Sequence, residues 1–271
     1  MRSRILLSFF LMALMLQSVE GQSVEKLRSG WKAKKASEVL VDGTVITGKD
    51  FQFYGWMNAV VPGTVLTTLL ENGKVPDPFF GMNNELIPDI SQTGPAEYTY
   101  WFYNEFDAPE LTDSQQLWLR FRGINYSADV YLNGQKVNTD THEGMYLREK
   151  YLITPFLEKG KNRLAVIVFP PDPAGTPDGQ GGDGLIGKSV SMQFTAGWDW
   201  ICPIRDRNTG IWDEVSLEKT GTVDLLDPFV RTKVPGKRIP SGKQAPAFVT
   251  ASADLVNTTG QKISGKLVAQ C

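Results

Sequence analysis

The chain has 271 residues, of which 41% are hydrophobic and 21% are charged, so it can bury a sizeable core. Its 28 Lys and Arg residues against 30 Asp and Glu residues give a formal net charge of -2. This balance gives no electrostatic reason to bind nucleic acid or an anionic membrane surface. The single histidine, His142, and the two cysteines, Cys202 and Cys271, argue against zinc clusters, iron–sulfur sites and a disulfide scaffold. We therefore expect no metal and no other cofactor.

The N-terminal residues have the pattern of a secretory signal. Arg2 and Arg4 precede an apolar run over residues 5–16, which is short for a membrane span. Small residues around Gly21 predict cleavage after that residue, so residues 1–21 are predicted to be a signal peptide. The alternatives are an N-terminal membrane anchor or a buried helix. The prediction places the mature protein outside the cytoplasm, either periplasmic or extracellular.

The rest of the sequence favours strands over helices. One helix is predicted over residues 64–71, because Pro62-Gly63 opens it and Asn72-Gly73 closes it. Asn133-Gly134 separates two short apolar runs and is the strongest hairpin signal in the chain. The apolar run over 163–169 suits a central strand. Further strands are expected over residues 98–103, 117–122, 128–132, 135–137 and 210–217. This regular spacing predicts an all-β sandwich of jelly-roll type.

The segment 170–187 is rich in Pro, Gly and Asp and is expected to be a long loop, of a length that is usually functional or disordered. A second series of strands starts after Thr220-Gly221, with candidates at 223–227, 230–234, 247–256 and 261–269. About fifty residues cannot close an ordinary sandwich of roughly 100 residues. We therefore interpret 22–220 as a first domain and 221–271 as an incomplete second β-domain. The alternative is a C-terminal extension that packs on the first domain.

Residues 197–215 read GWDWICPIRDRNTGIWDEV. This stretch resembles the signature of the N-terminal sugar-binding domain of glycoside hydrolase family 2. It is most similar to the branch that holds exo-β-glucosaminidases, β-mannosidases and endo-β-mannosidases. Three further segments agree with that branch and follow the same order: DPFFGMNNE at 77–85, YTYWF at 98–102, and GINYSADVYLNG at 123–134 with HEG at 142–144. The resemblance runs from about Trp31 to Lys219.

The resemblance implies a galactose-binding-like jelly-roll, then an immunoglobulin-like sandwich, then a TIM barrel. It also implies a retaining glycosidase acting on β-linked glucosamine or mannose residues. Two glutamates of the barrel would act as nucleophile and acid/base, roughly 5–5.5 Å apart. They would lie beyond Cys271, so this chain is expected to be an N-terminal fragment that carries recognition and none of the catalytic residues.

The tripeptide Trp198, Asp199 and Trp200 is the candidate substrate-binding site. A pyranose offers apolar C–H faces that stack on aromatic rings and hydroxyls that a carboxylate can bridge. In the family that this chain resembles, the equivalent loop reaches into the active site of the barrel. In a flat strand the two tryptophans share one face and Asp199 takes the other. We therefore expect Asp199 and one tryptophan to contact the sugar, at a bend favoured by Pro203. The alternative is that both tryptophans are core and Asp199 binds backbone amides.

Other chemically interesting residues have structural interpretations. Arg205, Asp206 and Arg207 are expected to form a solvated or inter-domain ion network with Asp213 and Glu214 across one turn. His142 is expected at the surface or in a hairpin, without a catalytic role. Cys202 is expected to be a small buried apolar residue.

Three functions fit these observations. The first is the carbohydrate-binding part of an exported glycosidase, whose partners would be a β-glucosaminide or β-mannoside and the missing C-terminal barrel. The second is a stand-alone carbohydrate-binding module without hydrolase activity. The third, a structural or adhesive domain, would need a large exposed interaction patch, which the sequence does not mark. None of the three involves nucleic acid or a membrane.

Overall fold

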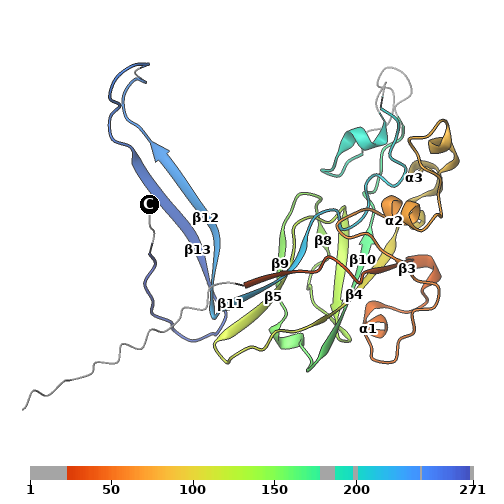
Figure 1. Cartoon of the computed structure of the whole chain (residues 1–271), viewed down its shortest axis with the longest axis horizontal. Helices are drawn as coiled ribbons and strands as arrows, with labels where there is room; N and C mark the ends of the chain where they lie inside the picture. The colour runs from red at the N-terminus through yellow and green to blue at the C-terminus, as the bar shows by residue number, and fades with distance from the viewer. Residues whose placement is uncertain (1–22, 178–186, 198–200, 239, 269–271) are drawn as a thin grey trace, which may run out of the picture.

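The computed structural model describes residues 23–177, 187–197, 201–238 and 240–268 (Figure 1). The predicted signal peptide, the tripeptide Trp198–Asp199–Trp200 and Cys271 lie outside the described residues. The described part forms two packed antiparallel sheets and a separate two-stranded hairpin.

The smaller sheet has four strands in the order β1-β11-β5-β9, and the larger has seven, in the order β3-β2-β4-β10-β6-β7 with β8 paired to β6. The smaller sheet consists of β1 (Ser23–Lys26), β11 (Val215–Gly221), β5 (Gln115–Phe121) and β9 (Glu149–Leu152). The larger sheet consists of β3 (Met57–Asn58), β2 (Lys32–Lys35), β4 (Tyr100–Asp107), β10 (Lys161–Phe169), β6 (Ser127–Leu132), β7 (Gln135–Lys136) and β8 (His142–Glu143). The predicted all-β sandwich is confirmed, and the run over 163–169 is the central strand that it was expected to be.

Short helices and 3-10 turns occur between the strands of the sandwich. They are α1 (Gly43–Ile46), α2 (Val65–Glu71), α3 (Ile90–Thr93) and the 3-10 turns η1 (Ala36–Glu38), η2 (Asn83–Leu86), η3 (Pro95–Glu97), η4 (Thr154–Phe156) and η5 (Gln193–Ala196). The predicted helix is α2, where Thr64 and Thr67 form a reciprocal capping box and Asn72 is the C-cap. No helix in the described part of the chain is long and apolar enough to cross a membrane.

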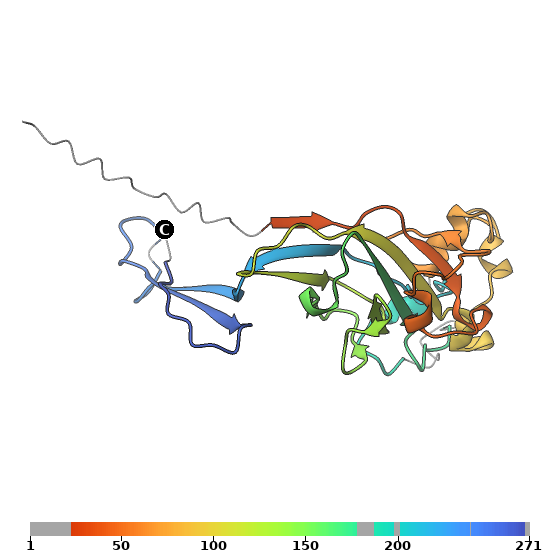
Figure 2. The same ribbon diagram turned by 90° about the horizontal axis from the view of Figure 1, so that it is seen from below.

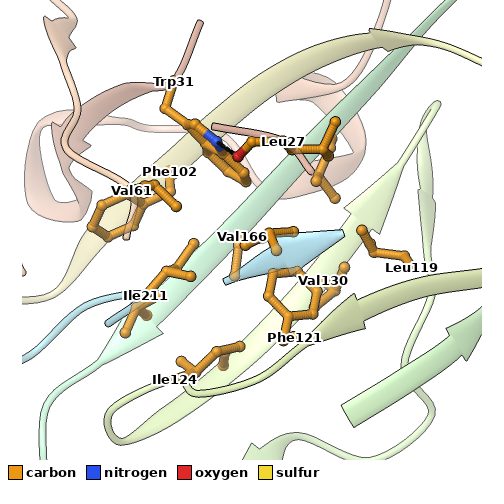
Figure 3. Packing of buried hydrophobic residues seen from close by; sticks show 14 of the residues in the cluster. Leu27, Trp31, Val61, Phe102, Leu119, Phe121, Ile124, Val130, Val166 and Ile211 are labelled. Atoms are coloured by element: carbon orange, nitrogen blue, oxygen red, sulfur yellow. Dashed lines mark hydrogen bonds between the residues drawn. The ribbon is translucent and has the colours of Figure 1, made fainter. Parts of the chain in front are cut away.

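The main core lies between the two sheets (Figure 3). Phe102 from β4 and Val166 from β10 meet Leu119 from β5, and all three are fully buried. Trp31 closes one edge, and its indole nitrogen donates to the Leu27 carbonyl at 2.8 Å. Along β6, every second residue is buried, as in a strand with one face on a core.

The outer face of the larger sheet has an aromatic cluster of its own. Trp101 and Tyr103 on β4 are buried there, under the segment that leads from α1 to β3. Within that segment, Phe53 and Trp56 meet edge to face, with ring centroids 5.3 Å apart. Both faces of β4 are therefore covered.

The Asn-Gly hairpin is confirmed. Asn133 and Gly134 have φ angles of 49° and 84° and connect β6 to β7. Both positive angles are those of a type I′ turn, which asparagine and glycine adopt most readily.

His142 is buried, so the surface position, one of the two that were predicted for it, is wrong. It pairs with Ala128 in the β8–β6 ladder, which turns its ring inward. The ring Nδ1 lies 3.1 Å from Glu149 Oε1, while Nε2 has no hydrogen-bond partner among the described residues.

Beyond the sandwich, β12 (Val223–Lys233) and β13 (Phe248–Asn257) pair as a hairpin that projects away from the two sheets (Figures 1 and 2). Residues 261–268 form no strand, so the last strand prediction was wrong over that range. A β-strand needs a partner for its backbone hydrogen bonds, and the described part of the chain pairs no strand with this segment.

Candidate functional site

A buried ion pair connects turn segments from distant parts of the sequence. Arg207 Nη2 and Nη1 lie 2.8 Å and 2.9 Å from the two carboxylate oxygens of Asp89. Both side chains are almost completely buried, at 1% and 0% exposure. Bidentate geometry of this kind adds both energy and directional specificity.

The remaining donors of Arg207 bind backbone carbonyls. Nε donates to Ala174, Nη1 to Ile204 and Nη2 to Gly175, at 3.2, 2.8 and 3.1 Å. All five N–H groups of the guanidinium are thereby used. Arg207 consequently joins α3, the segment after β10 and its own turn into one unit.

The charge of Asp89 is maintained in this setting. Burial raises the pKa of its carboxyl, but the hydrogen bonds from Arg207 and Ser91 and the charge of Arg207 outweigh burial, and the pKa is lowered. Asp89 also caps α3 by accepting from the Ser91 backbone N–H at 2.9 Å.

Arg205 ties a further turn to this unit. Its Nε donates to the Asn84 carbonyl at 2.8 Å, and the Asn84 amide donates to the Pro203 carbonyl at 3.2 Å. The motif over 77–85 is therefore in contact with the motif over 197–215, as two parts of one surface would be.

Asp206 has a different role from its two neighbours. Its carboxylate is fully buried and accepts from the backbone N–H of Leu66, in the first turn of α2, at 2.7 Å. It also accepts from the Asn208 N–H at 2.9 Å. Burial raises the pKa of Asp206 to about 6 despite these hydrogen bonds.

The expected ion network with Asp213 and Glu214 was wrong. Asp213 lies 3.6 Å from Arg122, and Glu214 pairs with Lys26. Arg207 and Asn208 have positive φ angles of 51° and 58°, so the chain turns there and directs the Arg207 side chain into the fold. The sequence could not show this turn, because neither residue is a glycine.

The backbone on both sides of residues 198–200 is hydrogen-bonded. Before them, Gly197 N–H donates to Phe194 O at 3.0 Å. After them, Ile204 N–H donates to Thr195 O at 2.8 Å, which joins the two sides. Cys202 is exposed, so its expected burial was wrong.

A cavity of about 320 Å³ borders the same unit. Its wall is mainly apolar, with Ile90 and Pro95 on one side and Pro171 and Pro173 on the other; Lys188 contributes a cation. The wall continues to Ala174 and Gly175, whose carbonyls bind Arg207.

Sequence reasoning missed Asp89 as a partner of Arg207. The available signal was an acidic residue two positions before Ser91, which is a pattern for a helix cap and not for an ion pair. Only the fold brings residues 89 and 207 together.

Comparison with known proteins agrees with this architecture. Residues 31–213 match the family model described as glycosyl hydrolase 2 galactose-binding domain-like. The chain belongs to this family. That result confirms the resemblance inferred from the four sequence segments.

Several relatives are full-length glycosidases. The chain is 50% identical over 208 residues to a mannosylglycoprotein endo-β-mannosidase of Lilium longiflorum. The matched region is 74% of this chain and 22% of the lily protein. The chain is 27% identical to an exo-β-D-glucosaminidase of Streptomyces avermitilis, covering 83% of this chain and 22% of that protein. Its structure is similar to that of an exo-chitosanase of Amycolatopsis orientalis, with a TM-score of 0.66, 26% identity and coverage of 87% and 24% of the two chains. The chain thus spans about a fifth to a quarter of these relatives.

Proposed function

We propose that this chain is the N-terminal carbohydrate-recognition part of an exported retaining glycosidase. The bond that is cut would join a β-linked mannose or glucosamine residue, and a catalytic barrel in a longer protein would cut it. Support comes from the activities for which the relatives are named, which are those of an endo-β-mannosidase and exo-β-glucosaminidases. The predicted signal over residues 1–21 supports export.

The observation that carries the proposal is the hydrogen-bonded base of the segment around Trp198–Trp200. The Thr195–Ile204 bond joins the two sides of this segment, and the Arg207–Asp89 pair fixes the following turn. A binding loop with an ordered base loses less conformational entropy when ligand binds. Such support is what a side chain needs if it is to hold a sugar in a defined position.

Within this segment, the proposal gives Asp199 the task of accepting hydrogen bonds from two sugar hydroxyls. One of Trp198 and Trp200 would stack on a C–H face of the ring, and the other would pack against the scaffold. Hydrogen bonds to a charged acceptor are worth about 1.5–3 kcal/mol each.

The test uses the full-length glycosidase and an aryl β-mannoside or aryl β-glucosaminide. Asp199→Ala is expected to lower kcat/KM by at least roughly 100-fold, because two such hydrogen bonds at the low end of this range contribute about 3 kcal/mol together. Asp213→Ala, a nearby carboxylate in the same motif, is the matched control and is expected to change kcat/KM less than threefold, by roughly the value of an exposed ion pair. An unchanged kcat/KM in Asp199→Ala would refute the role of Asp199.

The isolated chain distinguishes this proposal from a stand-alone carbohydrate-binding module. We expect residues 1–271 to hydrolyse no aryl β-glycoside. Turnover by this chain alone would contradict the proposal, while calorimetric binding of mannan or chitosan by the isolated chain would favour the stand-alone module.

A further inference from the structure

A polar pocket of about 640 Å³ lies at the β3–β2 edge of the larger sheet. Its residues come from β2, η1, β3, the end of α2 and the start of β4: Lys34, Lys35, Glu38, Gly55, Trp56, Met57, Asn58, Leu69, Asn72, Lys74 and Tyr100. Figures 1 and 2 show β3 beside α2. Ligand pockets in proteins commonly measure about 300–1,000 Å³.

The walls of the pocket are held by contacts within the fold. Asn72 Nδ2 donates to the Asn58 carbonyl at 2.8 Å and so fixes the end of α2 to β3. Trp56 meets Phe51 and Phe53 edge to face, with ring centroids 6.0 and 5.3 Å away. The indole is thus a rigid aromatic surface, of the kind on which the C–H face of a pyranose stacks.

Two polar groups of the pocket have no protein partner. Tyr100 is only 5% exposed, and no residue of the described segments forms a hydrogen bond with its hydroxyl. The same holds for the indole N–H of Trp56, which also lines the pocket. Trp56 is half-buried and both side chains line the pocket, so these donors are open to a ligand hydroxyl.

The hydroxyl of Tyr100 remains a donor at neutral pH. Burial raises its pKa to about 12, and the charges of Glu97 and Glu38 contribute to the shift.

Positive charge exceeds free negative charge around the pocket. Lys35 is neutralised by Glu97. Lys34 Nζ donates to the Tyr54 carbonyl at 2.9 Å, but neither Lys34 nor Lys74 has a carboxylate within ion-pair distance in the described part of the chain. Glu38 supplies one carboxylate. Unpaired lysines that border a pocket favour an anionic group on the ligand.

We propose that this pocket binds a pyranose that bears a carboxylate, as a hexuronate does. Trp56, Met57 and Leu69 would contact the apolar ring face. Tyr100 and the Trp56 N–H would bind hydroxyls, and Lys34 and Lys74 would bind the carboxylate. The proposal is independent of the role proposed for Asp199, because it uses none of the residues of the 197–215 motif.

The test titrates the 1–271 chain with sodium glucuronate and with trigalacturonate while amide resonances are followed by NMR. We expect shifts at β2, β3 and the end of α2. Lys74→Met and Lys34→Met are each expected to weaken binding roughly tenfold, and Tyr100→Phe roughly fivefold. Lys237→Met, an exposed lysine in the turn after β12, is the control and should bind as the parent chain does.

Three comparison ligands complete the design. Glucose supplies the ring without the charge, acetate supplies the charge without the ring, and glucose 6-sulfate supplies a different anion. Both uronates should bind at least tenfold more tightly than glucose or acetate.

Equal binding of acetate would show an unspecific anion site, and equal binding of glucose would show that the charge of the ligand has no part in binding. Tighter binding of the sulfate would assign the pocket to sulfated sugars, and no shifts at the pocket would exclude a sugar site. Each of these four results would overturn the proposal.

Discussion

The carboxylate of Asp89 and the guanidinium of Arg207, 118 residues apart in sequence, form a bidentate pair at 2.8 and 2.9 Å inside the fold. Around this pair α3, the segment after β10 and the turn at Arg207 become one structure. The main contribution of the pair is to hold these segments together. A buried ion pair adds little stability compared with an apolar replacement of similar shape.

Removing one partner of the pair should nevertheless be costly. Arg207→Ala leaves the Asp89 carboxylate buried and unpaired, so we expect a loss of about 3–5 kcal/mol in the free energy of unfolding. The double variant Arg207→Ala with Asp89→Ala should lose less than the sum of the two single variants, Arg207→Ala and Asp89→Ala, because no unpaired charge remains. Denaturant unfolding of the four proteins measures this. Additive losses would show that the two side chains do not depend on each other.

The raised pKa of Asp206 predicts a specific dependence of the unfolding free energy on pH. Its pKa is about 6 in the folded protein against an ordinary value of 3.8, so between these pH values the folded state holds the proton more tightly. Asp206 therefore makes stability fall as pH rises from about 4 to about 6, by roughly 3 kcal/mol for one buried group. Below about pH 4 the lowered pKa of Asp89 acts in the opposite sense, since its stabilising charge is lost by protonation.

Urea unfolding at a series of pH values tests the Asp206 prediction. The contribution between pH 4 and 6 should disappear in Asp206→Asn, whereas Asp213→Asn, in the same motif, should retain it. The comparison uses only the slope of the unfolding free energy against pH. The asparagine amide also faces the Leu66 and Asn208 N–H groups, so it lowers stability at every pH and leaves this slope unaffected. The same slope in Asp206→Asn and in the parent chain would mean that another group titrates.

Gly210 allows close packing of the motif on the start of α2. A Cβ at this position would lie 2.6 Å from the Gly63 carbonyl oxygen and 2.7 Å from the Thr64 Cα, on a backbone with φ of +151°. Gly210→Ala should therefore lower the free energy of unfolding by about 2–4 kcal/mol, from overpacking and backbone strain together. Gly94→Ala isolates the strain, since its φ is +83° and no atom lies within 4 Å of an added Cβ. Equal losses in the two variants would disprove the close approach.

Lys150 links the sandwich to the β12–β13 hairpin. Its ammonium lies 2.6 Å from Asp224 and 3.2 Å from Glu218, two carboxylates that are 3% and 4% exposed, and 5.0 Å from the ring of Trp118. Burial raises the pKa of Glu218, but the hydrogen bonds and charges of Arg120 and Lys150 outweigh burial and lower it.

Lys150→Met should thus lower the unfolding free energy by about 3 kcal/mol, because it leaves two buried carboxylates near each other. Lys161→Met provides the comparison, since its pair with Glu105 is exposed and should contribute less than about 1 kcal/mol. Thermal unfolding and limited proteolysis at the junction after β11 report the effect. If the two lysine variants lose equal stability, Lys150 has no special role in attaching the hairpin.

Much of the fold could be predicted from local patterns. The Pro-Gly and Asn-Gly signals around α2, the alternation in β5 and β6 and the apolar run of β10 depend on neighbours in sequence, and these elements form where they were expected. The last strand prediction failed because strand formation depends on a partner, which the described part of the chain does not pair with residues 261–268.

The contacts at the candidate site depend on long-range packing and were harder to predict. Arg207 was expected in a solvated network but is buried on Asp89, and His142 was expected at the surface but faces Glu149 inside the fold. Both errors have one cause: the direction of a side chain follows from positive φ angles or ladder register, which composition does not reveal. The placement of Asp199 stays a prediction.

The most direct test of the proposed function is the position of the Asp199 carboxylate in a crystal structure of the proposed full-length glycosidase with a bound β-mannoside or β-glucosaminide. We predict that one or both of its oxygens lie about 2.5–3.0 Å from sugar hydroxyl oxygens, with Trp198 or Trp200 stacked on the ring. A carboxylate that instead binds backbone amides of its own domain, beyond hydrogen-bond distance of every hydroxyl of the sugar, would contradict the account.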